Sequence, residues 1–144
     1  MSVLTRARTD PQPTEVSLVR LHAMRAGYLL MAVGLVLVKW PLLPKAHTLP
    51  LYEGVTLCWL TAMSVLAFIA LRHPVKLVPL LVLESLWKVL WLSLVALPRL
   101  ASRDMDTAAS QVAFNCLFVI PIIAVTPWRY VWRTYVASTG ERWR

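Results

Sequence analysis

Four long apolar segments, separated by short polar stretches, divide this chain. They occupy about residues 26–43, 51–71, 77–97 and 108–126. An α-helix rises about 1.5 Å per residue and needs about 20 residues to cross the hydrocarbon core of a bilayer, and each segment is close to that length. The pattern therefore predicts an all-α fold, a four-helix transmembrane bundle formed by residues 18–126.

The connections between the spans have their own local signals. The prolines of residues 41–50 predict a stiff, non-helical connection after the first span. Residues 72–76 are long enough only for an antiparallel helical hairpin between the second and third spans. Asp106 is a suitable N-cap for the fourth span, in which Pro121 predicts a kink.

The two ends of the chain differ from the spans and from each other. Residues 1–17 are polar and aperiodic, so we expect a disordered cytoplasmic tail. In residues 127–144 apolar residues first recur with helical spacing while basic residues take the other side, which predicts an amphipathic interfacial helix followed by a tail. The expected contacts with the membrane surface are Trp128, Arg129, Trp132 and Arg133.

Composition and charge support a membrane location. Hydrophobic residues make up 58% of the chain, above the roughly 45–50% of soluble domains. The formal net charge is +8, but the cations flank apolar spans and form no recognition motif, so we expect anionic lipid rather than nucleic acid as their partner. Most cations lie on the side of the two termini. The positive-inside rule then predicts a multi-pass membrane protein with both termini in the cytoplasm.

The third span contains two charges of opposite sign, Glu84 and Lys88. They are one helical turn apart with the acid first, which is the favourable orientation for an ion pair. One ionised group at the centre of a bilayer costs at least about 2.5–3.5 kcal/mol, so we expect the pair to face inward and to neutralise itself. Trp87 and Trp91 flank it on nearly the same face.

Depth along the helices groups other polar residues near this ion pair. Asn115 and Thr61 fall at a similar predicted depth, and Lys39 and Glu53 form a shallower tier above them. Two interpretations remain open. The layer is either a ligand pocket, in which the ion pair meets a polar head group and the tryptophans hold an apolar part, or a structural ion pair that fixes helix rotation.

No catalytic or metal-binding constellation is recognisable in the sequence. The three histidines, His22, His47 and His73, fall on opposite sides of the predicted membrane, and no nucleophile or phosphate-binding motif is present. We therefore predict no cofactor and no metal. For Cys58 and Cys116 we expect buried free thiols, with a disulfide between the second and fourth spans as the alternative.

Two motifs carry a resemblance to known proteins. Residues 74–88 read P-x-K-x-x-P-L-L-x-x-E-x-x-W-K, and residues 127–131 read P-W-R-Y-V. Both motifs resemble a functionally uncharacterised bacterial family of small four-span membrane proteins, and the layout is more loosely similar to DoxX-like membrane proteins, some of which are linked to quinone or redox partners. The resemblance implies fold and topology but no activity.

These observations and the resemblance predict a non-enzymatic binding or accessory protein of the inner membrane with a polar intramembrane site at Glu84 and Lys88. Its expected partners are membrane lipids and a lipid-like small molecule or another membrane protein. One alternative is a small proton-coupled transporter that uses Glu84, and another is a membrane-bound, quinone-linked redox protein. Lys88 weighs against the transporter, because a neighbouring ammonium favours the charged form of a carboxyl group that a carrier must protonate.

Overall fold

The computed structural model describes residues 16–140, so residues 1–15 of the tail predicted for 1–17 and the end of the chain at 141–144 lie outside it. The described part contains helices and short connections. In chain order the elements are α1 (Leu18–Lys39), the 3-10 helix η1 (Trp40–Thr48), α2 (Leu51–Arg72), α3 (Val78–Trp91), the π-helical turn η2 (Leu92–Ala96), α4 (Leu97–Ala101), α5 (Thr107–Leu117), α6 (Val119–Val125), α7 (Trp128–Val131) and the π-helical turn η3 (Trp132–Val136).

Four helical segments are long and apolar enough to cross a membrane. They are Leu18–Thr48, Leu51–Arg72, Val78–Ala101 and Thr107–Val125. Many of their large apolar side chains are exposed. This is expected of a surface that contacts lipid, because lipid chains are as apolar as these side chains and the hydrophobic effect does not drive their burial. The predicted all-α bundle is confirmed, and length and composition make the chain a multi-pass membrane protein.

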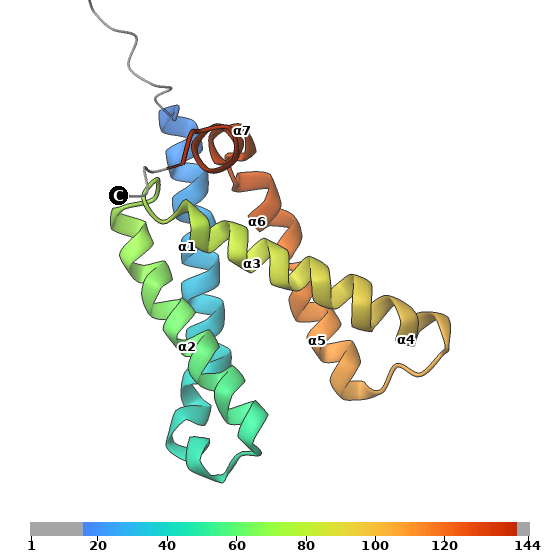
Figure 1. Cartoon of the computed structure of the whole chain (residues 1–144). Helices are drawn as coiled ribbons and strands as arrows, with labels where there is room; N and C mark the ends of the chain where they lie inside the picture. Colours follow the sequence, from blue (N-terminus) through green and yellow to red (C-terminus); the bar gives the residue numbers. More distant parts are fainter. Residues whose placement is uncertain (1–15, 141–144) are drawn as a thin grey trace, which may run out of the picture.

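The spans form two antiparallel hairpins. α1 packs along α2, while α3 packs against α6, and α1 also contacts α6. The name terminal end is used for the end of the molecule where α1 begins and α6 finishes. The name distal end is used for the opposite end, which contains η1 and residues 102–106. Figure 1 shows the hairpins diverging toward the distal end. The contacts between the hairpins are therefore concentrated toward the terminal end.

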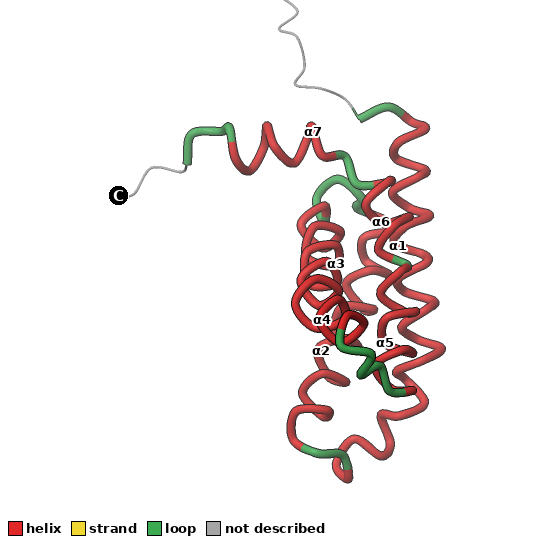
Figure 2. The backbone as a smooth tube through the Cα atoms, turned by 90° about the vertical axis from the view of Figure 1, so that its right-hand side faces the viewer, coloured by secondary structure: helices red, strands yellow, loops and turns green. Residues whose placement is uncertain are grey.

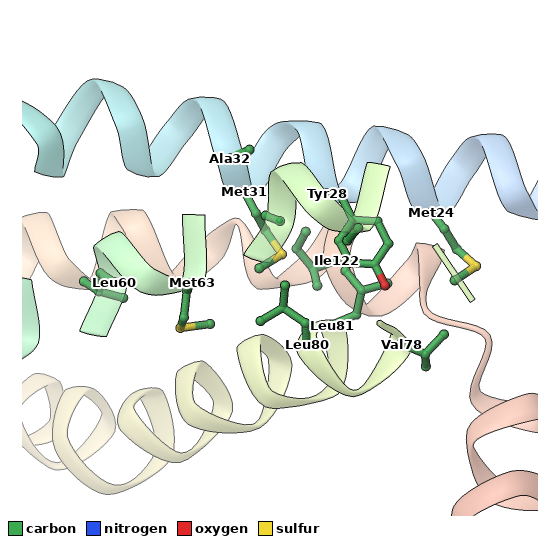
Figure 3. Close-up of a cluster of buried hydrophobic side chains, with 12 residues drawn as sticks. Met24, Tyr28, Met31, Ala32, Leu60, Met63, Val78, Leu80, Leu81 and Ile122 are labelled. Atoms are coloured by element: carbon green, nitrogen blue, oxygen red, sulfur yellow. The ribbon is translucent and has the colours of Figure 1, made fainter. Parts of the chain in front are cut away.

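The hydrophobic core lies where the two hairpins meet. Met24 and Tyr28 of α1, Leu81 of α3 and Ile122 of α6 are fully buried members of one cluster (Figure 3). The hydroxyl of Tyr28 donates a hydrogen bond to the carbonyl of Pro74 at 2.9 Å. This bond satisfies a buried polar group and ties α1 to the turn between α2 and α3.

Two arginines of α1 satisfy helix ends on neighbouring elements. Arg25 Nε donates to the carbonyl of Leu71 at 3.2 Å, and Arg20 Nη2 donates to the carbonyl of Thr126 at 2.7 Å. These carbonyls lie at the carboxyl ends of α2 and α6, where intrahelical partners run out and the helix dipole favours a cation. The same arginines that indicate topology in the sequence thus also fasten the bundle.

The first connection differs from the sequence prediction. The first span does not run from 26 to 43 into a non-helical loop. α1 begins earlier, at Leu18, and ends at Lys39, and residues 40–48 form the 3-10 helix η1. Pro41 lies in the first turn of η1, where its missing N–H removes no hydrogen bond and its fixed φ suits a helix.

Two other local predictions are confirmed. The side chain of Asp106 caps α5 by accepting a hydrogen bond from the backbone N–H of Ala109 at 2.6 Å. The fourth span is interrupted at Phe118, whose ψ is −4°. Pro121 cannot donate to the carbonyl of Leu117, and its ring crowds that carbonyl, so the helix breaks one turn before the proline.

Gly27 and Gly34 offer a matched test of the packing between α1 and α6. A Cβ on Gly27 would lie 2.7 Å from Val125 Cγ2, whereas one on Gly34 would have nothing within 4 Å. We expect Gly27→Leu to lower the free energy of unfolding by about 1–3 kcal/mol through overpacking, and Gly34→Leu to leave it close to wild type. Thermal melting of both variants in detergent measures this, and equal melting temperatures would contradict the close approach.

Candidate functional site

The ion pair predicted in the third span is formed. Lys88 Nζ lies 2.7 Å from Glu84 Oε1, and the two side chains are only 10% and 3% exposed. Trp87 Nε1 donates a hydrogen bond to Glu84 Oε2 at 2.7 Å. Both carboxylate oxygens therefore have a charged or N–H partner, which is the condition under which a buried charge is tolerated.

Trp87 serves both members of the pair. Besides its hydrogen bond to Glu84, its ring lies 5.7 Å from Lys88 Nζ, measured to the centroid, within the range of a cation–π interaction. Trp91, the other tryptophan predicted to flank the pair, is partly buried on the next turn. The turn η2, which continues α3 beyond the pair, contacts α5.

The predicted polar layer around the ion pair is not assembled. Asn115 lies on the exposed side of α5, while the next residue, Cys116, is buried. Consecutive helical residues point about 100° apart, so the two side chains take different faces. The hydroxyl of Thr61 donates to the carbonyl of Leu57 on its own helix at 2.7 Å. The two residues were expected at the same depth as the ion pair. The rotation of α5, however, turns Asn115 outward, and the hydroxyl of Thr61 forms its hydrogen bond within α2.

A polar network not predicted from the sequence joins the first hairpin. Trp40 Nε1 donates to Ser64 Oγ at 3.0 Å, and Ser64 Oγ donates to the carbonyl of Thr61 at 2.6 Å. Ser64 is fully buried. The hydrogen bonds anchor the start of η1 to the middle of α2, so they hold η1 against the hairpin.

The predicted shallow tier lines a cavity of about 360 Å³ at the distal end. Lys39, the last residue of α1, and Glu53, in the first turn of α2, contribute its charges, and Leu42, Tyr52 and Leu57 contribute apolar surface. Within residues 16–140 the only ion pair is the one between Glu84 and Lys88. The two opposite charges of the cavity therefore line one space without neutralising each other through direct contact.

In the segment predicted to form an amphipathic helix and a tail, residues 127–144, the helical part consists of α7 and η3. It leaves the bundle sideways at the terminal end (Figure 2). Trp128 and Trp132 are exposed, as are Arg129 and Arg133. Trp128 Nε1 donates to the carbonyl of Ile123 at 2.9 Å, which fixes the start of this segment to α6.

Within residues 16–140 the two cysteines form no disulfide, and the histidines, cysteines and acidic residues form no metal site. Cys58 is exposed on α2, Cys116 is buried on α5, and both are free thiols. The alternative of a disulfide between the second and fourth spans is therefore wrong, and so is the expectation that Cys58 is buried. No group of histidine, cysteine and acidic side chains in residues 16–140 could hold a metal ion.

Comparison of the chain with family models, curated proteins and solved structures found no match. The resemblance to the four-span family and to DoxX-like proteins stays a prediction. In the structure, residues 74–88 supply the turn after α2, the start of α3 and the ion pair, and residues 127–131 supply α7 and the proline before it. Both motifs therefore lie at junctions that set the direction of the chain.

The coupling within the ion pair can be measured directly. We expect Lys88→Met alone to destabilise the protein by about 3–5 kcal/mol, because it leaves a buried carboxylate without its cation. The double variant Glu84→Gln with Lys88→Met should lose less, since the amide oxygen still accepts from Trp87 and no net charge remains. Thermal melting in detergent compares the two, and equal losses would show that the side chains are not coupled.

Proposed function

We propose that this protein is a non-enzymatic binding protein of the inner membrane that holds a zwitterionic lipid in its distal cavity. The observation that carries the proposal is the placement of Lys39 and Glu53, opposite in charge and not paired with each other, around one space of about 360 Å³. Both termini lie in the cytoplasm, because the cations gather at the terminal end. The distal cavity then opens toward the outer surface.

The chemistry of the cavity selects the ligand. The ammonium of Lys39 binds a phosphate, and the carboxylate of Glu53 accepts hydrogen bonds from a primary ammonium. Leu42 and Leu57 offer apolar surface to the glycerol and the first methylene groups of the chains. A volume near 360 Å³ is at the lower end of the roughly 300–1,000 Å³ typical of ligand sites. A phosphoethanolamine head group carries both required charges.

In this proposal the Glu84–Lys88 ion pair has a structural role and does not contact the lipid. Both oxygens of Glu84 already have partners in Lys88 and Trp87, so a ligand would have to displace one of them. Neither of the two end cavities is lined by the pair. Of the two interpretations of the pair, the geometry favours the structural one. The same pairing disfavours a proton-coupled transporter, because such a transporter must protonate Glu84.

The test is native mass spectrometry of the protein released from micelles that contain equal amounts of phosphatidylethanolamine and phosphatidylcholine. We expect the wild-type protein to retain phosphatidylethanolamine at least about fivefold over phosphatidylcholine, because a primary ammonium donates hydrogen bonds to a carboxylate and a trimethylated one cannot. Lys39→Met and Glu53→Gln should each abolish the preference.

Lys45→Met is the matched control, since Lys45 lies on the exposed surface of η1 and does not line the cavity. It should keep the wild-type preference. If Lys45→Met loses as much lipid as Lys39→Met, the binding reflects general surface charge and the proposal is wrong. Equal retention of the two lipids by the wild-type protein would also overturn it.

A further inference from the structure

A second cavity, of about 350 Å³, lies at the terminal end between the start of α1 and the segment formed by α7 and η3. Its charged lining residues are Arg20, Arg129 and Arg133, and no acidic residue of the described range lines it. These arginines form no ion pair with a carboxylate in residues 16–140. Three like charges around one space favour an anion that lies between them.

The backbone brings these arginines together from the two ends of the described chain. Arg20 Nη2 bonds the carbonyl of Thr126 at 2.7 Å, which holds the first turn of α1 against the end of α6. Pro127 then turns the chain away from the bundle. Arg129 and Arg133 follow in helical conformation, one turn apart, and so lie on the same side of that segment.

Two apolar residues that line the cavity pack against the protein core. Val16 and Tyr130 line it, and both pack against the hydrophobic core cluster. Because α6 ends here and Trp128 and Trp132 are exposed on the same segment, the cavity lies at the depth of lipid head groups. Exposed cations beside partly buried apolar residues match the boundary between the phosphate of a lipid and its glycerol with acyl chains.

We infer that this cavity binds the phosphate group of an anionic phospholipid. A guanidinium group presents two parallel N–H donors that match two phosphate oxygens, so arginine holds a phosphate more specifically than lysine does. The site differs from the distal cavity in position, in charge and in residues. The test of this site is therefore independent of the test of the proposed function.

The test combines native mass spectrometry with thermal melting of the full chain in detergent. Phosphatidylglycerol is the anionic probe, phosphatidylcholine the neutral one, and inorganic phosphate the soluble one. We expect the wild-type protein to retain phosphatidylglycerol about tenfold over phosphatidylcholine, and we expect the double variant Arg129→Gln with Arg133→Gln to retain the two lipids equally. The single variant Arg133→Gln should show an intermediate preference.

The matched control is the double variant Arg72→Gln with Lys76→Gln. These residues carry the same charge, are exposed in and beside the turn between α2 and α3, and do not line the cavity. The control should keep the tenfold preference, and circular dichroism should show the same helicity in all variants. If the control loses the preference as fully as the arginine variant does, the inference is wrong.

The soluble probe separates two sources of the same chemistry. A rise in melting temperature with phosphatidylglycerol, and none with inorganic phosphate, assigns the site to lipid. A rise of equal size with inorganic phosphate, lost in Arg129→Gln with Arg133→Gln, supports the phosphate site and assigns it to a free phosphate. No preference for phosphatidylglycerol and no response to phosphate would overturn the inference.

Discussion

A charge in hydrocarbon must be paired, and in this protein that constraint sets the rotation of α3. Only a rotation that turns Glu84 and Lys88 inward together, with the indole of Trp87 beside them, avoids the high free energy of an exposed charge in lipid. The same rotation directs Leu81, one turn earlier, toward α1, where a Cβ on Gly27 would lie 3.8 Å from it. Polar and apolar contacts thus specify one packing.

This packing explains where the molecule is closed and where it is open. The core fills the space in which the two hairpins meet, and the ion pair is buried on α3 one turn beyond Leu81 of that core. Beyond it the hairpins diverge (Figure 1), and the two cavities lie at opposite ends of the bundle. Recognition at the two ends, as proposed above, would need no opening of the buried middle.

Local rules made much of this fold predictable. Span lengths follow from helix rise, the cap at Asp106 from hydrogen bonding within one turn, and the break before Pro121 from its missing N–H. The spacing of Glu84 and Lys88 similarly implied their pairing. The side on which Asn115 lies could not be predicted, because it depends on the rotation of α5 against α3, and depth along a helix carries no information about rotation.

The arginines of the terminal end have different structural roles, which a count of cations does not distinguish. Arg20 and Arg25 enter the positive-inside bias in the same way as Arg129 and Arg133, since the bias depends on charge. In the bundle, however, Arg20 and Arg25 bond carbonyls at helix ends. Arg129 and Arg133 instead extend on a segment outside the bundle. Because a guanidinium has five donors, Arg20 can fasten α1 to α6 and still offer N–H groups to an anion.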